Sequence, residues 1–185
     1  MNQKDRPTLI ELREKIGQVK SLSEQMEFLV TDTVPGGVPR GVLCEIIGSA
    51  RTEWILRLFK QNPSLNIFWA ENQLTILPTA IHQRGIDLNR ILMAETGENL
   101  FQSLRKALKS RLFDCVVLPG AIEDIKMLKA LQLFARESNS CIFFLSKIAK
   151  ISWAIHFQLE AEWIMESESI SINLLKSKFS QTGTV

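Results

Sequence analysis

The chain has 185 residues, a length typical of one domain with a sizeable core. Apolar residues make up 45% and charged residues 23%, which is the composition of an ordinary folded protein and argues against disorder. The formal net charge of +2 is too small to single out nucleic acid or an anionic membrane as a partner. Contact with DNA would need a local basic patch.

The sequence carries no pattern that points to secretion, a membrane or a metal. Residues 1–15 have neither an apolar core nor a small-residue cleavage site, so we expect no signal peptide. The most apolar stretch, Cys141–Leu145, is far too short to cross a bilayer. The two histidines are far apart, and no CxxC spacing occurs, so we expect no metal. The three cysteines lie in apolar runs, which indicates buried thiols and a cytoplasmic protein: Cys44, Cys115 and Cys141.

The N-terminal part of the chain is predicted to be helical. Over residues 8–20, apolar side chains recur every three or four positions, which is typical of an amphipathic helix. A second short helix is predicted over residues 23–30. The prolines and glycines of residues 34–41 then interrupt regular structure. We therefore divide the chain into a helical arm (residues 1–34), a main domain (residues 35–179) and a flexible tail (residues 180–185).

The main domain is predicted to alternate short apolar strands with helices. Such strands belong to a mostly parallel twisted sheet that helices cover on both faces. After residue 152 the pattern changes to two alternating strands separated by a polar turn, which predicts an antiparallel hairpin at the sheet edge. The expected strands are residues 42–47, 65–70, 91–94, 115–118 and 141–145, and the expected helices are residues 52–61, 77–84, 98–111 and 122–137.

The loop after the first strand is where a nucleotide-binding protein of this class would hold phosphate. That chemistry requires a glycine-rich loop ending in Gly-Lys-Ser/Thr, whose amides and lysine surround the phosphates. Here only the opening Gly48 fits, because the second glycine of the motif falls on Glu53. The lysine falls on Trp54 and the hydroxyl residue on Ile55. Glu53 would repel phosphate, and Trp54 is bulky and uncharged.

Two further observations argue against nucleotide hydrolysis. Arg51 and Thr52 precede the expected lysine and hydroxyl positions, so they could serve the loop only if the motif were shifted along the chain. The fourth strand should end in an acid that holds a metal ion, but residues 116–120 contain none. We therefore expect no cofactor, no catalytic residue and no enzyme activity.

Several short motifs resemble the ATPase core of the RecA recombinases, in the same order along the chain. None is specific alone, but the ordered set from residue 37 to residue 120 predicts a RecA-like fold. The motifs are Val38-Pro39-Arg40-Gly41, Cys44-Glu45-Ile46-Ile47-Gly48, Ala70-Glu71, Gly85-Ile86-Asp87-Leu88-Asn89, Thr96-Gly97-Glu98 and Phe113-Asp114-Cys115-Val116-Val117. Glu71 matches the family's water-activating glutamate, although an ordinary acid at a strand end is the favoured interpretation here.

Among RecA-like proteins that lack a working nucleotide site, the chain is more similar to the ImuA group than to the SulA group. The similarity lies in Leu12-Arg13-Glu14, in the entry Gly36–Gly41 and in the ending Leu174–Lys178. It implies an accessory protein of SOS mutagenesis and DNA repair, which binds a Y-family (translesion synthesis) polymerase homologue, RecA, or both. The alternative is a SulA-like inhibitor that binds the tubulin-like cell-division protein. A diverged ATPase using Arg51, Thr52 and Glu71 is the remote third hypothesis.

Four residues are our candidates for contact with a protein partner: Leu9, Leu12, Ile16 and Trp54. The first three form the apolar stripe of the predicted N-terminal helix, which could dock in a groove. Trp54 fills the vacated phosphate position, our favoured interpretation, or anchors a partner. Lys147 and Lys150, after the fifth strand, are the candidate DNA contacts. For that segment, a tight turn into the hairpin is the favoured alternative.

Overall fold

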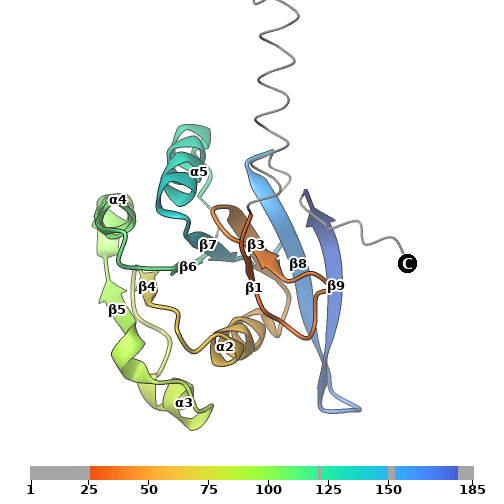
Figure 1. Cartoon of the computed structure of the whole chain (residues 1–185). Coiled ribbons are helices and arrows are strands. Elements are labelled where there is room, and N and C mark those ends of the chain that lie inside the picture. Colours follow the sequence, from red (N-terminus) through yellow and green to blue (C-terminus); the bar gives the residue numbers. More distant parts are fainter. Residues whose placement is uncertain (1–25, 121, 150–152, 179–185) are drawn as a thin grey trace, which may run out of the picture.

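The computed structural model of the protein describes residues 26–120, 122–149 and 153–178. Its body is a seven-stranded sheet in the order β5-β4-β6-β7-β3-β8-β9, with helices on both faces (Figure 1). The strands are β3 (Leu43–Ile47), β4 (Ile67–Glu71), β5 (Ile91–Glu95), β6 (Cys115–Pro119), β7 (Cys141–Leu145), β8 (Ile155–Ile164) and β9 (Ser169–Ser177). The helices are α2 (Arg51–Gln61), α3 (Pro78–Gln83), α4 (Leu100–Ser110) and α5 (Ile125–Ser138), together with the short 3-10 helices η1 (Leu88–Arg90) and η2 (Gly97–Asn99).

The pairing of the strands confirms the predicted α/β class. From β5 to β8, every pair of neighbouring strands in the sheet is parallel. Only the last pair in the sheet, β8 and β9, is antiparallel. The sheet is therefore mostly parallel and carries the predicted C-terminal hairpin. Its first strand, β3, lies between β7 and β8 rather than beside β4. This order differs from that of the dinucleotide-binding folds, whose first strand lies beside the second.

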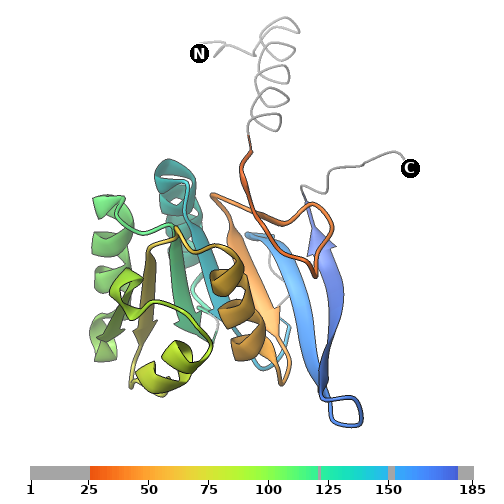
Figure 2. The same cartoon turned by 60° about the horizontal axis from the view of Figure 1, so that its bottom comes forward.

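Each face of the sheet has its own apolar layer. The helices α2 and α3 cover one face, and α4 and α5 cover the other (Figure 2). Buried side chains alternate between the faces along each strand, as the two-residue period of a strand requires. In β7, for example, Phe143 packs with Phe59 of α2, whereas Ile142 and Phe144 lie in the layer of Leu104 and Leu131.

The segment before the sheet differs from the prediction. In place of the helix expected over residues 23–30, β1 (Phe28–Leu29) pairs antiparallel with β2 (Val38–Pro39), and residues 23–25 lie outside the described residues. The φ angles of Gly36 and Gly37, +82° and +81°, let the chain reverse between these strands. Leu29 and Val34 are buried in the layer of α2, so residues 26–34, assigned above to the arm, pack against the main domain.

The connection between β7 and β8 also differs from the prediction. A tight turn cannot join these strands, because β8 runs parallel to β3, which itself runs parallel to β7. The start of β8, at Ile155, therefore lies at the opposite edge of the sheet from the end of β7, at Leu145. Ala154 is buried in the layer of α4 and α5, which places the end of this crossover on that face. Sequence periodicity does not report strand direction, so it could not separate a turn from a crossover.

The three cysteines lie on adjacent central strands and share the layer of α2. Cys115 of β6 stands opposite Cys141 of β7, and Cys44 lies on the neighbouring β3. All three are free thiols with no exposed surface. Burial in this apolar layer raises the pKa of Cys44 and Cys115 well above the usual thiol value.

We predict that these thiols do not react with a thiol-specific reagent while the protein is folded. Reaction requires access to the sulfur atom, and burial removes that access for all three cysteines. In Cys44 and Cys115 burial also disfavours the thiolate. Labelling with an aromatic disulfide at neutral pH should be on the order of a thousandfold slower than in denaturant, where all three thiols react. One thiol that reacts at the unfolded rate in native buffer would contradict this.

Candidate functional site

At several places along the carboxyl edge of the sheet, neighbouring strands continue to opposite faces. β3 leads into α2 on one face, whereas the segment after β7 ends on the other face. Likewise β4 leads to α3, and its neighbour β6 leads to α5. Ligands of open α/β sheets bind in the crevice that such a divergence leaves. Both crevices contain a surface hollow.

The connection from β3 to α2 is too short for a phosphate loop. β3 ends at Ile47 and α2 begins at Arg51, so only residues 48–50 lie between strand and helix. The positions that correspond to the second glycine, the lysine and the hydroxyl residue fall inside the helix. A phosphate cradle needs several successive loop amides that point at the ligand, and this connection lacks the length to provide them.

The backbone just before α2 is hydrogen-bonded to the neighbouring strand β8. The backbone amide of Ser49 donates to Glu162 Oε2 at 3.1 Å, and the Ser49 hydroxyl donates to the same oxygen. The amide of Ala50 donates to the carbonyl of Ala161 at 2.9 Å. The hydroxyl and the amide of Ser49, and to a smaller extent Arg51, lower the pKa of Glu162 below its usual value, so the carboxylate is charged at neutral pH. A carboxylate of β8 thus lies where an incoming phosphate would bind.

The remaining residues of the degenerate loop have structural contacts of their own. Arg51 Nη1 donates to the carbonyl of Gly48 at 2.7 Å. Glu53 forms ion pairs with Arg84 at 2.7 Å and, within the helix, with Arg57 at 3.3 Å. Thr52 is exposed on the first turn of α2. None of these side chains reaches toward a shared phosphate position.

Trp54, our candidate for either filling the pocket or anchoring a partner, is buried in the layer under α2. Its side chain is 1% exposed, and its indole N–H donates to the hydroxyl of Thr33 at 2.9 Å. A partner cannot reach this ring in the folded protein. The burial of Trp54 agrees with the interpretation that it fills the interior. Through Thr33, its ring connects α2 to residues 26–39.

The hollow between β3 and β7 carries positive charge. It is lined by Arg51, Pro119, Gly120, Leu145, Ser146, Lys147 and Ile148. The two cations come from the first turn of α2 and from the segment after β7, and none of the described residues that line the hollow is acidic. The Ser146 side chain is 3% exposed, and its hydroxyl has no hydrogen-bond partner among the described residues. The hollow therefore suits an acidic group, without the amide cradle that a nucleotide triphosphate needs.

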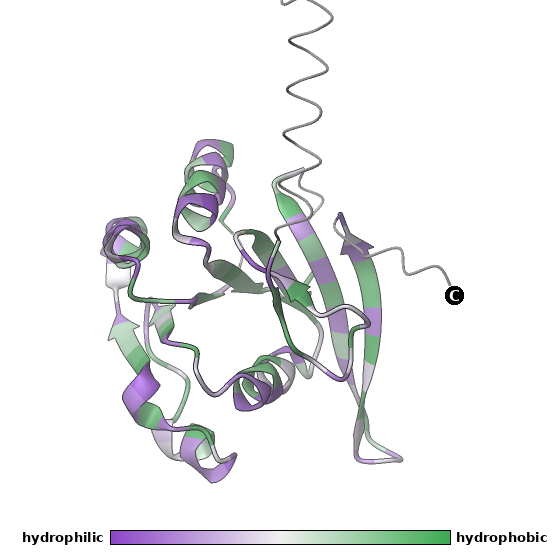
Figure 3. Ribbon diagram, viewed as in Figure 1, coloured by the Kyte–Doolittle hydropathy of each residue, from purple (hydrophilic) through white to green (hydrophobic). Residues whose placement is uncertain are grey.

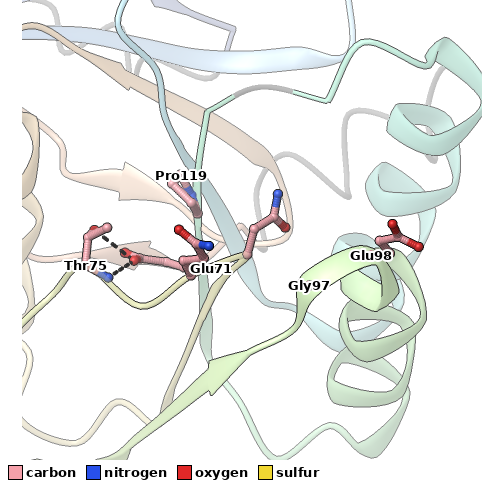
Figure 4. Close-up of a pocket in the computed structure, with 7 residues that line it drawn as sticks. Glu71, Thr75, Gly97, Glu98 and Pro119 are labelled. Carbon is pink, nitrogen blue, oxygen red and sulfur yellow. Dashed lines mark hydrogen bonds between the residues drawn. The ribbon is translucent and has the colours of Figure 1, made fainter.

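The hollow between β4 and β6 is acidic (Figure 4). It contains Glu71 and Glu98, and the described residues of its lining include no lysine or arginine. Glu71 is 4% exposed, and both of its carboxylate oxygens accept hydrogen bonds from neighbouring residues. It accepts from the indole of Trp69 at 2.8 Å, from the amide of Thr75 at 2.5 Å and from the Thr75 hydroxyl at 2.8 Å. These contacts fix the loop after β4, so Glu71 acts as a structural acid at a strand end.

Other candidates lie elsewhere or outside the described residues. Leu9, Leu12, Ile16 and Lys150 are outside them. Lys147 is exposed and lines the cationic hollow. Among the residues that the structure describes, no cluster of three or more histidine, cysteine or acidic side chains is placed to hold a metal ion. In the same part of the chain, no helix is long and apolar enough to span a membrane.

Sequence reasoning missed the residues that fill the start of α2. Glu162 lies within the predicted hairpin, where an acidic residue suggests only a solvated strand face. Gly48 came closest to a signal, because its φ of +97° and its approach to β8 require a glycine there. Only the parallel pairing of β8 with β3 brings Glu162 beside Ser49.

His156 of β8 is a buried titratable group away from this edge. Its ring lies 3.1 Å from the side-chain amide nitrogen of Gln132 of α5. Burial, and to a smaller extent the nearby cations Lys178, Arg136 and Lys176, lower its pKa to about 4. The ring is therefore neutral at pH 7 in the folded protein.

We predict that His156 makes the protein less stable in mild acid. The unfolded chain takes up a proton near pH 6.5, whereas the folded chain does so only near the lowered pKa of about 4. The stabilisation is complete above pH 6.5 and is lost as the pH falls to 4. From pH 7 to pH 4.5 the wild type should lose about 2 kcal/mol more of its free energy of unfolding than His156→Gln.

Urea titrations at several pH values measure this difference. His82 is exposed on α3, so His82→Gln should follow the wild-type pH dependence. Parallel pH profiles for wild type and His156→Gln would show that the ring does not titrate as described.

Neither the models of known protein families nor the curated proteins with which the sequence was compared gave a match.

Proposed function

We propose that this protein is a non-catalytic RecA-like accessory protein of the SOS response, which binds a Y-family polymerase homologue, RecA, or both during error-prone DNA synthesis. The partners follow from the resemblance to the ImuA group. The observation that carries the non-catalytic part is the Glu162 carboxylate at the start of α2, bonded to Ser49. This carboxylate is negatively charged and repels phosphate, and it lies at the position where a nucleotide-binding protein of this class would hold phosphate.

The positions of the RecA-like motifs support the same proposal. Gly48 follows the first strand, Glu71 ends the second, and Thr96-Gly97-Glu98 opens the helical segment after the third. These motifs thus lie along one edge of the sheet, as residues of a common ancestral site would. Two features support the loss of catalysis in this proposal: Glu71 is held by Trp69 and Thr75, and the fourth strand ends at Pro119.

The cationic hollow is the surface of this edge that can meet a partner. Arg51 and Lys147 line it, and Lys147 is exposed. Paired cations beside a crevice favour an acidic side chain or a terminal carboxylate of another protein. In this proposal a partner protein binds at the carboxyl edge of the sheet, where related folds bind a nucleotide.

Calorimetry with ATP and magnesium tests the non-catalytic part. We expect no measurable heat of binding for the wild type or for Glu162→Ala, because removing the carboxylate restores neither the loop nor the lysine. Binding of ATP that is lost in Arg51→Ala would contradict the proposal. It would favour the diverged ATPase that uses Arg51, Thr52 and Glu71.

A pull-down from DNA-damaged cells, read by mass spectrometry, tests the partners. We expect the tagged protein to recover a Y-family polymerase homologue or RecA, and the double variant Arg51→Glu/Lys147→Glu to recover less. Arg105→Glu/Lys106→Glu on α4 makes the same change of charge away from the hollow and should behave as wild type. Recovery of the tubulin-like division protein instead would place the chain with the SulA group and overturn the proposed partners.

A further inference from the structure

The helices α4 and α5 lie next to each other on one face of the sheet (Figures 1 and 2). Together they carry six cations and a single acid, Glu137, an excess larger than the net charge of +2 of the whole chain. Positive charge is therefore concentrated on these two helices. The cations, which we call the basic face, are all exposed: Arg105, Lys106 and Lys109 of α4, and Lys126, Lys129 and Arg136 of α5.

The cations of α4 form one stripe along the outer side of the helix. Lys109 follows Arg105 by four residues and Lys106 by three, the spacings that place side chains on the same side of a helix. α4 contains no acidic residue, and none of its exposed side chains is apolar. Figure 3 shows hydrophilic and hydrophobic bands alternating along α4 and α5. A surface hollow lies along the stripe, and its described lining consists of Gln102 and the three cations.

The cations of the basic face form no ion pair with an acid among the described residues. On the opposite face of the sheet, by contrast, Arg57 and Arg84 both form ion pairs with Glu53. Like charges that lie side by side without partners repel one another. A polyanion relieves this repulsion, and its condensed counterions are released when the cations of the protein replace them.

Trp153 lies at the border of the basic face, beside α5. Its ring is 53% exposed, and the Lys129 ammonium lies 5.6 Å from the ring centre. The next residue, Ala154, is buried in the layer of α4 and α5, which holds Trp153 on this face of the sheet. Proteins that bind single-stranded nucleic acid combine cations for the phosphates with exposed aromatic rings on which bases stack.

We propose that the basic face binds a single strand of nucleic acid, DNA or RNA. The phosphates lie along the cations of α4 and α5, and a base stacks on Trp153. The basic face shares no residue with the cationic hollow between β3 and β7, so this site is independent of the proposed protein partners.

The composition of the basic face favours nucleic acid over other anionic partners. A helix that lies on a membrane buries a broad apolar side in the lipid, whereas the apolar residues of α4 are turned into the protein. Interfaces between proteins are poor in lysine, and four of the six cations here are lysines. Lysine and arginine clustered on one face are typical of contact with phosphates.

Fluorescence anisotropy of the purified protein with a labelled oligothymidylate, at several salt concentrations, tests the cations. Arg105→Gln/Lys106→Gln should weaken binding by about tenfold at low salt and make the slope of log K against log salt shallower by about 1.4, since each phosphate contact on a single strand contributes about 0.7. Arg57→Gln/Lys60→Gln on α2 removes the same charge from the opposite face and should bind as wild type. Equal weakening by the two variants, or no binding by the wild type at low salt, overturns the proposal.

Trp153→Ala tests the stacking in the same assay. It should weaken binding by about fivefold or more while the salt slope stays unchanged, because no charge is removed. Trp163→Ala is the control: this ring is 40% exposed and stands opposite Ile170, on the face that carries α2, so binding should not change.

Three competing ligands or sites are separated by the same measurement. A duplex that binds as tightly as the single strand would overturn the assignment to single strands. Binding to vesicles of phosphatidylserine and phosphatidylcholine without binding to the oligonucleotide would assign the basic face to a membrane instead. Loss of binding in Arg51→Gln/Lys147→Gln, with Arg105→Gln/Lys106→Gln unaffected, would move the nucleic acid to the cationic hollow and overturn the proposed site.

Discussion

Gly48→Ala should destabilise the protein by at least about 4 kcal/mol, enough to unfold much of a typical domain. A Cβ at this position would lie 2.2 Å from the carbonyl oxygen of Ala161, a contact that neither backbone can relieve without separating β3 from β8. The φ of +97° adds strain for any residue with a side chain. The measurement is the urea midpoint and slope, followed by circular dichroism.

Gly36→Ala is the control for the strain alone. Gly36 also has a positive φ, +82°, but a Cβ there has no atom within 4 Å. Its cost should stay at about 1–2 kcal/mol. Equal losses in the two variants would mean that the close contact between Gly48 and β8 is not what requires glycine.

Trp54→Ala should cost about 4 kcal/mol of the free energy of unfolding. The substitution removes a large, fully buried ring from the layer under α2 and leaves the Thr33 hydroxyl without its donor. Trp153→Ala is the matched control, because that ring is 53% exposed and its contact with the Lys129 ammonium is of the surface kind. It should cost less than about 1 kcal/mol.

The same pair of variants tells whether Trp54 only stabilises the fold or also anchors a partner. If Trp54 only supports the fold, partner binding by Trp54→Ala should fall in proportion to the unfolded fraction and recover at lower temperature. Loss of partner binding by a fully folded Trp54→Ala protein, shown by an unchanged near-ultraviolet signal from the other tryptophans, would instead favour the anchor.

The alternation of apolar runs with helical periods was enough to predict the parallel sheet, and the boundaries of its elements agree to within a few residues. Cys141–Leu145 is one such run, bounded by polar residues on both sides, so its length alone identifies a buried strand. The degenerate phosphate loop was readable for a similar reason: Glu53 and Trp54 have the wrong chemistry for phosphate in any fold.

What the sequence did not predict depends on contacts between distant segments. The helix expected over residues 23–30 is wrong because Phe28 and Leu29 pair with β2, a tertiary contact that overrides local helical spacing. The direction of β8, and with it the crossover after β7, is set by its pairing with β3. The Glu162–Ser49 contact is a consequence of that pairing, so no local pattern could reveal it.

The position of β3 has a consequence for how the chain folds during synthesis. β3 is the first strand of the sheet to leave the ribosome, yet both of its neighbours come from the last third of the chain: Leu43 pairs with Ile142 and with Ile155. Contacts this distant in sequence slow folding, because a long loop must close before they form. A nascent chain that ends before β8 holds an apolar strand with an open edge, so the domain should complete its fold only after β8 has left the ribosome.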